Sequence, residues 1–357
     1  MIISMKVAMK IRAAILFCAV AFSACDTDIE PEVVQGLYEY DEQYYENLRA
    51  YKKSDHTLFF CWYPGWTRTE GGGDIPNPAS WGERIIGLPD SVDIVDLWMG
   101  IPSPDPNDTE YAYAPLAWED MQFCRRVKGT RFVSHIDACW ISKFTYQGKE
   151  WDLTTDGDEA IEAFADKHVA DVYKYQIDGV DLDHEPNAWW RANFSKVMHA
   201  FAKRIGPKSP HPEILLMHNG YSCFTDRTVG ELVDYFISQA YNCYGASDLQ
   251  RRYDGDQDYV PTSKFIVTEN LGDNHENAGV PFTEADGNTI TSDFWCEPVG
   301  KGSRMYSLEG MARWNPTQGK KAGFGGFYVN RDYYSKTGIP YYNLRRTILI
   351  ANPPVHK

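Results

Sequence analysis

The sequence predicts a single (β/α)8 barrel, an α/β fold also known as a TIM barrel. Eight strand-like runs occur between residues 57 and 330, and helical patterns lie between most of them. This alternation is typical of parallel strands joined by crossover helices. Polar and aromatic residues gather at nearly every run end, where a barrel of this kind carries its functional residues. About 300 residues are enough for one large domain of this class.

The predicted strands are short apolar runs. In chain order they are Thr57–Trp62, Val92–Met99, Arg131–Cys139, Gly179–Glu185, Ile214–His218, Tyr235–Asn242, Lys264–Thr268 and Gly325–Asn330. The clearest helix is Asp158–Tyr175, in which apolar residues recur at helical spacing, and Phe194–Ile205 is a second. The chain contains no internal repeat and no low-complexity segment, so a single barrel accounts for the alternating pattern.

Residues 1–24 have the pattern of an export signal. Basic residues precede the apolar run Ala13–Phe22, which is too short to span a bilayer. The sequence Phe22-Ser23-Ala24-Cys25 then resembles a bacterial lipobox. This resemblance implies that Cys25 is lipidated and anchors the mature protein to a membrane. An ordinary signal peptide with a chance cysteine is the alternative.

Residues 25–55 are predicted to be an acidic tether and N-terminal segment, and residues 56–357 are predicted to form the barrel domain. The run Asp26–Glu32 is rich in acids and is expected to stay solvated. It resembles the runs that accompany export in Bacteroidetes-type surface lipoproteins. The resemblance implies a lipid-anchored place in the cell envelope, on the outer face of the outer membrane.

Composition excludes some classes of partner. The formal net charge of −15 argues against nucleic acid and anionic partners. Aromatic residues make up 14% of the chain, which suits sugar binding and equally suits a large core. Of the 8 cysteines, Cys18 belongs to the export segment and Cys25 to the lipobox, and the others form no C-x-x-C pair. A zinc site is therefore not expected, and disulfide pairs cannot be chosen from the sequence.

One predicted strand carries a row of acids. Asp181, Asp183 and Glu185 alternate with apolar or aromatic residues, so a strand would present all three on one face. Pro186 removes a backbone donor and should end the strand. Buried like charges raise one another's pKa, so one member is expected to hold a proton near neutral pH, as a general acid requires. A solvated edge strand is the alternative.

The spacing Asp178-x-x-Asp181-x-Asp183-x-Glu185 resembles the D-x-x-D-x-D-x-E signature of glycoside hydrolase family 18. That family contains chitinases and endo-β-N-acetylglucosaminidases on a (β/α)8 barrel, with the signature on strand four. All four acids are present. The resemblance implies a glycosidase that needs no cofactor and no metal.

Two further motifs resemble the endo-β-N-acetylglucosaminidase branch of the family. In Gln239-Ala240-Tyr241-Asn242 the glutamine comes first, as it often does in that branch, whereas chitinases usually carry M-x-Y-D. A core tyrosine that closes a strand is the alternative for Tyr241. Gly325–Asn330 resembles strand eight, but Asn330 or its neighbours stand where chitinases have a tryptophan under the cleavage subsite. This departure favours the endoglycosidase branch.

The resemblance implies a retaining, substrate-assisted mechanism. Glu185 is expected to protonate the glycosidic oxygen and later to act as base on water. The 2-acetamido oxygen of the substrate attacks the anomeric carbon, while Asp183 holds the acetamide N–H and Tyr241 bonds to the acetamide carbonyl. Asp181 shares a proton with Asp183 as a coupled pair. Asp178 lies nearer the strand start and is expected to be structural.

Other polar residues near strand ends are predicted to bind the substrate. They are Gln239, Asn242, His135, Asp137, His218, Asn219 and Asn330. Histidines and acids on different strands lack the short spacing of metal ligands, so these groups are expected to form hydrogen bonds. Several tryptophans are candidate sugar platforms, although each is as readily explained by packing: Trp62, Trp66, Trp98, Trp140, Trp189 and Trp190.

The first functional hypothesis is a surface-anchored endo-β-N-acetylglucosaminidase that hydrolyses the GlcNAc-β1,4-GlcNAc core of N-linked glycans. A chitinase is the alternative within the enzyme class. A glycan-binding lipoprotein that has lost turnover is the alternative outside it. The joint presence of Glu185, Asp183 and Tyr241 argues against lost turnover, because a pure binder has no evident need for all three.

Overall fold

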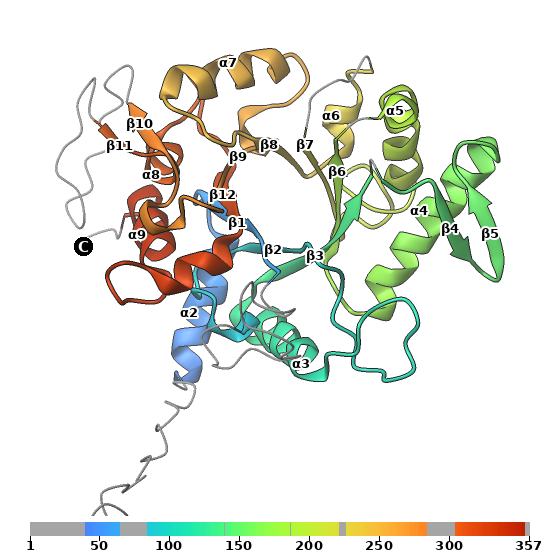
Figure 1. Cartoon of the computed structure of the whole chain (residues 1–357), viewed down its shortest axis with the longest axis horizontal. Coiled ribbons are helices and arrows are strands. Elements are labelled where there is room, and N and C mark those ends of the chain that lie inside the picture. Colours follow the sequence, from blue (N-terminus) through green and yellow to red (C-terminus); the bar gives the residue numbers. More distant parts are fainter. Residues whose placement is uncertain are drawn as a thin grey trace, which may run out of the picture. The chain divides into compact units, whose positions relative to one another are not determined.

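Eight parallel strands close into a barrel in the structure, a computed structural model (Figure 1). They are β1 (Leu58–Trp62), β2 (Ile94–Leu97), β3 (Arg131–Asp137), β6 (Gly179–His184), β7 (Leu215–Gly220), β8 (Tyr235–Gln239), β9 (Phe265–Asn270) and β12 (Gly323–Phe327). Their order around the barrel is β1-β12-β9-β8-β7-β6-β3-β2. Each strand overlaps one of the eight predicted runs, so the predicted (β/α)8 barrel is confirmed.

The structure describes residues 40–64, 84–138, 140–185, 187–220, 226–283 and 304–353. The export segment, Cys25, the acidic run Asp26–Glu32, Trp66 and Pro186 lie outside these ranges. Within them, no helix has both the length and the apolar character that crossing a membrane requires.

Helices follow most of the barrel strands and cover the outside of the barrel (Figure 1). They are α3 (Pro115–Phe123), α4 (Gly157–Lys174), α5 (Ala188–Ala202), α6 (Val229–Leu232), α7 (Ala246–Asp256), α8 (Ser307–Arg313) and α9 (Tyr342–Ala351). The predicted helix Asp158–Tyr175 corresponds to α4. The predicted helix Phe194–Ile205 overlaps α5, which starts earlier because the Asn187 side chain caps it by accepting the N–H of Trp190.

Two short antiparallel pairs extend the loops at the open end of the barrel strands. The strands β4 (Lys143–Tyr146) and β5 (Lys149–Asp152) form a hairpin between β3 and α4. The strands β10 (Pro281–Thr283) and β11 (Arg304–Tyr306) pair between β9 and α8. Both pairs belong to connections that follow the carboxyl end of a barrel strand, which is the end that carries the site.

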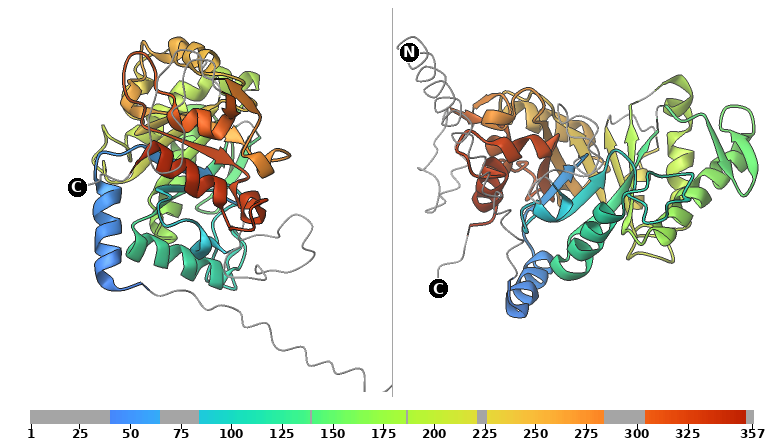
Figure 2. Two further views of the ribbon diagram at one scale, coloured as in Figure 1. Left: turned by 90° about the vertical axis from the view of Figure 1, so that its left-hand side faces the viewer. Right: turned by 60° about the horizontal axis from the view of Figure 1, so that its bottom comes forward.

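The helix α2 (Glu42–Lys53) precedes β1 and packs on the barrel. Lys52 Nζ donates to the carbonyl of Val92, two residues before β2, with a distance of 2.7 Å. Figure 2 shows α2 lying beside α3. The compact unit therefore begins at Tyr40, before the domain start predicted at residue 56. The start of α2 has an N-cap residue: the Asp41 side chain accepts the N–H of Tyr44 at 2.8 Å.

Strand alternation divides the core into two parts. Leu58, Phe60 and Trp62 of β1 point into the barrel, where they pack with apolar residues of the other strands. Residues of the opposite parity, such as Phe59, pack against the helices. The barrel closes tightly at β12, where a Cβ on Gly325 would lie 1.8 Å from the carbonyl oxygen of Phe60. Only glycine fits this approach of two backbones.

Three cysteines within the described ranges are buried and free. They are Cys61, Cys124 and Cys243. Burial raises the pKa of the Cys124 thiol to about 11 and that of Cys243 to about 12. These thiols therefore stay protonated and behave as small apolar core residues.

Candidate active site

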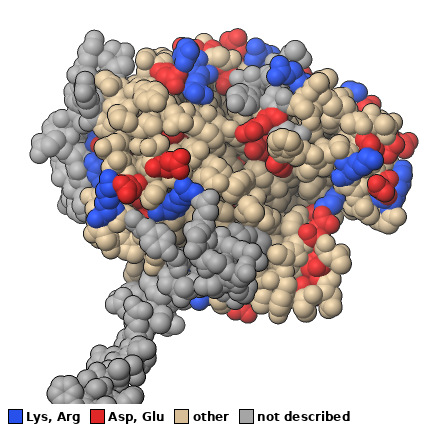
Figure 3. All heavy atoms as spheres, viewed as in Figure 1, with Lys and Arg blue, Asp and Glu red and all other residues tan. Residues whose placement is uncertain are grey.

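The three acids of the row become more exposed along β6. Asp181 is fully buried, Asp183 is partly buried, and Glu185 is exposed just beyond the end of the strand. Val180 and Leu182 face the other way and pack against the helices. Asp181 and Asp183 therefore share the inward face of β6, and Glu185 follows the strand at the surface. Acidic side chains gather on the surface over this end of β6 (Figure 3).

Two amides from neighbouring strands orient the inner acids. Asn219 of β7 donates from Nδ2 to Asp181 Oδ2 at 2.8 Å. Gln239 of β8 donates from Nε2 to Asn219 Oδ1 at 2.8 Å and to Asp183 Oδ1 at 3.0 Å. The amides thus connect both carboxyl groups through one set of hydrogen bonds, which fixes the rotamer of each acid.

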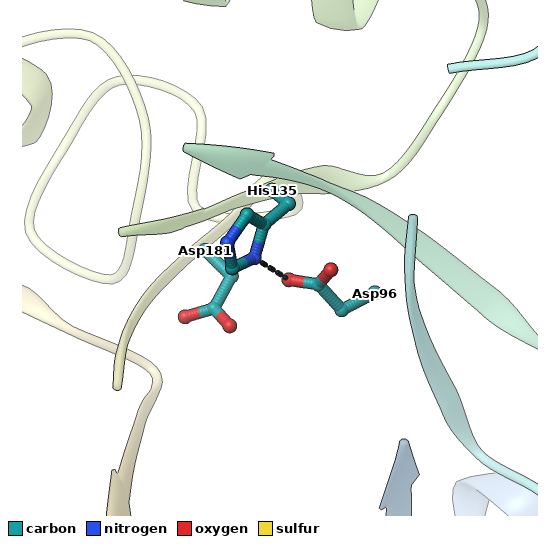
Figure 4. Close-up of side chains that lie close together, drawn as sticks. All are labelled: Asp96, His135 and Asp181. Carbon is teal, nitrogen blue, oxygen red and sulfur yellow. Dashed lines mark hydrogen bonds and ion pairs between the residues drawn. The ribbon is translucent and has the colours of Figure 1, made fainter. Parts of the chain in front are cut away.

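A second group of ionisable side chains lies on the opposite side of Asp181. His135 of β3 is the cross-strand partner of Asp181, and Asp96 of β2 lies next to His135 (Figure 4). His135 Nδ1 is 3.2 Å from Asp96 Oδ2, and His135 Nε2 is 3.6 Å from Asp183 Oδ2. Asp96 and Asp181 are both fully buried, and within the described residues each keeps one oxygen without a donor.

Burial raises the pKa of all three inner carboxyl groups. The pKa of Asp96 and that of Asp181 lie well above the usual range, with burial as the largest cause and nearby carboxylates adding to it. Burial also raises the pKa of Asp183 to about 7, opposed by the charge of His135 and assisted by Asp181 and Glu185. At neutral pH the site therefore holds protons among its inner acids, as the row predicted.

Tyr241 lies just beyond the end of β8, close to the acids. Burial raises the pKa of its phenol well above its usual range, and the charges of Asp183 and Glu185 raise it further. The hydroxyl group therefore remains a hydrogen-bond donor. The ring lies parallel to that of Phe327, with 6.2 Å between the centroids.

An aromatic cluster continues from Tyr241 across the open end of the barrel. Phe327, the last residue of β12, packs edge-on against Trp98 at 4.6 Å, and Trp98 also contacts Tyr328 at 5.4 Å. These rings are partly buried. Aromatic faces beside a row of acids are the combination that a sugar site requires.

A buried acid holds the turn that carries Tyr241. Glu269, near the end of β9, accepts at Oε1 the main-chain N–H groups of Asn242 and Asn270, both at 2.7 Å. Burial raises the pKa of Glu269, and these hydrogen bonds oppose that rise. Asn242 has a φ of 56°, in the left-handed region, and its side chain is exposed. Its predicted contact with substrate stays a prediction.

His218 does not face the barrel interior. It is buried on the outer face of β7, stacked on Phe236 at 4.5 Å and packed edge-on against Phe194 of α5 at 5.3 Å. Because Asn219 points inward, strand alternation directs His218 toward the helices. Burial and the nearby His184 lower the pKa of His218 well below its usual range. The prediction that His218 binds substrate is wrong.

Two other predicted binding residues lie beneath the acids. His135 is nearly buried, between Asp96 and Asp183, and Asn219 is fully buried behind Asp181. Both contact the acids of the row, and their predicted direct contact with substrate stays a prediction. They act on the acids that would touch the substrate.

The remaining predicted binding residues lie at the open end of the barrel. Asp137, the last residue of β3, is partly buried and is the cross-strand partner of Asp183. Asn330 lies beyond β12, in the 3-10 helix Val329–Tyr334. The inward side chain at the end of β12 is Phe327. Of the residues that could replace the chitinase tryptophan, Asn330 or a neighbour, Phe327 is thus the one that faces the barrel.

The candidate tryptophan platforms differ in exposure. Trp62 lies in the barrel core, and Trp190 is buried with its Nε1 donating to the carbonyl of Ile141 at 3.0 Å. Both are packing residues. Trp140, after β3, is 80% exposed and remains a candidate platform. Trp189 is partly buried and packs edge-on against Trp190.

The carboxyl and imidazole atoms of Asp96, His135 and Asp181 lie within 4.8 Å of one another, which is close enough to hold a cation. Asp181 Oδ2 accepts an N–H from Asn219 Nδ2, and Asp96 Oδ2 lies 3.2 Å from His135 Nδ1. The other oxygen of each acid, Asp96 Oδ1 and Asp181 Oδ1, has no donor among the described residues and can share a proton. We therefore assign the cluster to shared protons.

Sequence reasoning missed two residues of the site. Asp96 and Glu269 are single acids on different strands, and both are fully buried. Their signal in the sequence was an acid inside an apolar strand run, near its carboxyl end. That signal identifies a buried polar group but does not show which residues of other strands the group contacts. Those contacts depend on the order of the strands in the barrel.

A closed (β/α)8 barrel with a graded row of acids at the carboxyl ends of its strands has the architecture of a glycoside hydrolase. Residues 62–325 match the model of the endo-beta-N-acetylglucosaminidase EndoS TIM-barrel domain. Because that match covers more than half of the chain, the chain belongs to this family.

Named relatives agree with the family assignment. The chain is 26% identical over 303 residues to endo-beta-N-acetylglucosaminidase F2 of Elizabethkingia meningoseptica, covering 80% of this chain and 77% of that protein. It is also 26% identical over 270 residues to an endo-beta-N-acetylglucosaminidase of Bifidobacterium longum subsp. infantis, covering 70% of this chain and about half, 48%, of that protein. The chain is thus a glycoside hydrolase of the endoglycosidase class.

Solved structures share the fold. The apo structure of an endo-beta-N-acetylglucosaminidase from Cordyceps militaris superposes with a TM-score of 0.62, at 19% identity, over 88% of this chain and 98% of that chain. At this level of identity the likeness shows a shared barrel architecture.

Proposed function

We propose that this chain is a retaining, substrate-assisted endo-β-N-acetylglucosaminidase that hydrolyses the GlcNAc-β1,4-GlcNAc core of N-linked glycans. The observation that carries this proposal is the graded exposure of the acid row. Glu185 is exposed where a glycosidic oxygen can reach it, while Asp183 and Asp181 lie progressively deeper. A proton donor at the surface and a partly protonated pair behind it suit a mechanism in which the sugar supplies the nucleophile.

Each residue has one task in the proposed reaction. Glu185 protonates the departing glycosidic oxygen, and the acetamide oxygen of the sugar attacks the anomeric carbon. Asp183 accepts the acetamide N–H, and Tyr241 donates its hydroxyl hydrogen to the acetamide oxygen. Water then attacks, with Glu185 as the base, and the anomeric configuration is retained.

Direct attack by Asp183 fits the site less well. A carboxylate nucleophile must be ionised and free to approach carbon. Burial raises the pKa of Asp183 to about 7, and its Oδ1 is held by Gln239 at 3.0 Å. A protein group held in this way is suited to orient an acetamide rather than to form a covalent bond.

The choice of N-glycan core over chitin rests on two observations. The inward residue at the end of β12 is Phe327, and Gln239 takes the first position of the strand-six motif. The relatives are named endo-beta-N-acetylglucosaminidases. A high-mannose glycoprotein and a chitin oligomer, incubated in parallel, test this choice. We expect release of glycan that ends in one GlcNAc; cleavage of chitin alone would support a chitinase, and binding without cleavage would support a non-catalytic role.

The role of Glu185 is tested by Glu185→Gln, which keeps the shape of the side chain and removes its proton donor. We expect kcat to fall by about 100-fold or more, with glycan binding retained. Glu159→Gln makes the same chemical change at an exposed position on α4 and serves as the matched control. Near-normal turnover of an unactivated substrate by the Glu185 variant would show that another group is the acid.

We also propose that the protein is lipid-anchored through Cys25 on the outer face of the outer membrane. The support is the lipobox-like sequence and the acidic run that follows it. Metabolic labelling with a fatty acid, compared between wild type and Cys25→Ser, tests the anchor. Protease treatment of intact cells tests the face, and a chain that stays protected would place it inside.

A further inference from the structure

The inner acids of the site are in contact with a histidine that the proposed reaction does not use. His135 Nδ1 meets Asp96 at 3.2 Å, and its Nε2 lies 3.6 Å from Asp183 Oδ2. Only 5% of the His135 side chain is exposed, and Asp96 is fully buried. An imidazole held on one side by a buried acid and directed at a second acid on the other has the arrangement of a proton acceptor.

Asp96 and Asp181 are placed to share a proton. Each of these carboxyl groups keeps one buried oxygen without a donor among the described residues. A proton shared between the two acids would satisfy both of these oxygens. A further proton of the group can lie on Asp183 or on His135, since Asp183 Oδ2 and His135 Nε2 face each other at 3.6 Å.

We propose that Asp96 and His135 are positioning residues for the reaction, and that His135 takes the proton of Asp183 when Asp183 has to become a carboxylate. This inference rests on the proposed function, in which Asp183 accepts the acetamide N–H. The proton leaves Asp183 Oδ2 and binds His135 Nε2, so the acid becomes an anion and the imidazole a cation. The present distance of 3.6 Å is longer than a hydrogen bond, and such contacts tighten when substrate binds.

The exchange avoids a large electrostatic cost. Releasing the Asp183 proton to water would leave a new, unpaired charge in a mostly buried site, which is unfavourable. Moving it to His135 leaves the net charge unchanged and creates an adjacent ion pair. Asp96 holds the imidazole through Nδ1, which fixes the ring orientation.

Several charged or titratable groups face this pair and share in its equilibrium. They are Asp96 of β2, Asp137 of β3, Asp181 and Glu185 of the acid row, and Tyr241 after β8. The anionic groups favour a proton on either Asp183 or His135 and do not choose between them. The choice depends on Asp96, which lies on the side of His135.

The first test is His135→Gln, which replaces the imidazole by a neutral amide of similar reach. Without the cation, Asp183 should hold its proton to higher pH, so the acidic limb of the kcat/KM profile should move upward by roughly one to three pH units. Activity at pH 6 should fall at least tenfold and should recover at pH 8. Equal loss at every pH would indicate a purely structural role and would overturn the proposal.

A matched control exists at the other end of the barrel. His56 and Asp93 form a buried pair at 3.0 Å, with 4% and 3% of their side chains exposed. His56→Gln should lower stability without moving the acidic limb. If it moves the limb as His135→Gln does, the shift reports a general loss of packing and the proposal is wrong.

A second readout requires no turnover. The imidazole of His135 can be followed by NMR from pH 5 to pH 9, with its signal identified by its loss in His135→Gln. Asp183→Asn removes the group with which the ring exchanges its proton, and Asp96→Asn removes the acid that contacts Nδ1, so each should change the titration midpoint of the ring. An unchanged midpoint in both would refute the proposal. Absence of hydrolysis by the wild type would instead refute the proposed function, so the two failures are distinct.

Discussion

The turn that carries Tyr241 depends on Glu269, and replacing that acid should affect both stability and turnover. Glu269 is fully buried and accepts two main-chain N–H groups, from Asn242 and Asn270, each at 2.7 Å. Glu269→Ala would leave both N–H groups without an acceptor in a place that water reaches poorly. Glu269→Gln would keep an oxygen at the same position and lose only the charge.

The expected magnitudes follow from the two bonds. Hydrogen bonds to a charged group contribute about 1.5–3 kcal/mol each, so two contribute about 3–6 kcal/mol. The buried acid carries a desolvation cost that alanine removes, which lowers the expected net loss for Glu269→Ala to about 2–4 kcal/mol. Glu269→Gln should lose about 1 kcal/mol. A turn that moves Tyr241 by about 1 Å should also lower kcat about 100-fold in the alanine variant.

Urea unfolding and steady-state kinetics on one glycopeptide substrate measure both effects. The decisive comparison is the double variant Glu269→Ala with Tyr241→Phe. If Glu269 acts by placing the Tyr241 hydroxyl, the double variant should be no slower than the slower single variant. Additive losses in kcat would show that Glu269 contributes to turnover by another route, and an unchanged kcat in Glu269→Ala would show that the turn does not depend on it.

Two further predictions concern single side chains. Tyr241→Phe should lower kcat by about 10²–10³-fold, because a donor to the developing charge is lost, while stability should hold because the ring keeps its place beside Phe327; a loss below threefold would remove Tyr241 from the mechanism. Burial lowers the pKa of His168 well below its usual range. As the pH falls below about 6.5, His168 therefore binds a proton in the unfolded chain but not in the folded chain. This group should lower the unfolding free energy by about 1.4 kcal/mol per pH unit there, and His168→Gln, measured by urea unfolding between pH 7.5 and 5, should lack that slope.

The strands and the acid row were predictable because their signals are local. The two-residue alternation of a strand can be recognised within about five or six residues of sequence, and Asp181, Asp183 and Glu185 all lie at odd positions of that alternation. The site beneath the row was not predictable in the same way. Asp96 lies on β2 and Asp181 on β6, and the pairing of both strands with β3 brings them together around His135.

The error at His218 has a different cause. His218 and Asn219 are adjacent in β7, so at most one of them can point into the barrel. Both faces of a barrel strand are buried, one against the barrel interior and one against the helices, so hydrophobicity does not reveal which residue points inward. Sequence alone could therefore show that His218 and Asn219 do not both point into the barrel, but it could not show that Asn219 is the one that does.

The position of the proton donor follows from exposure more than from pKa. Asp96 and Asp181 have the most strongly raised pKa values of the inner acids, which by itself would nominate them as acids for catalysis. Both are fully buried and neither can meet a glycosidic oxygen. A general acid has to reach the atom that it protonates before its pKa matters. Glu185 is the member of the row that meets this condition, and the protonated acids behind it limit the negative charge that the site would otherwise accumulate beside it.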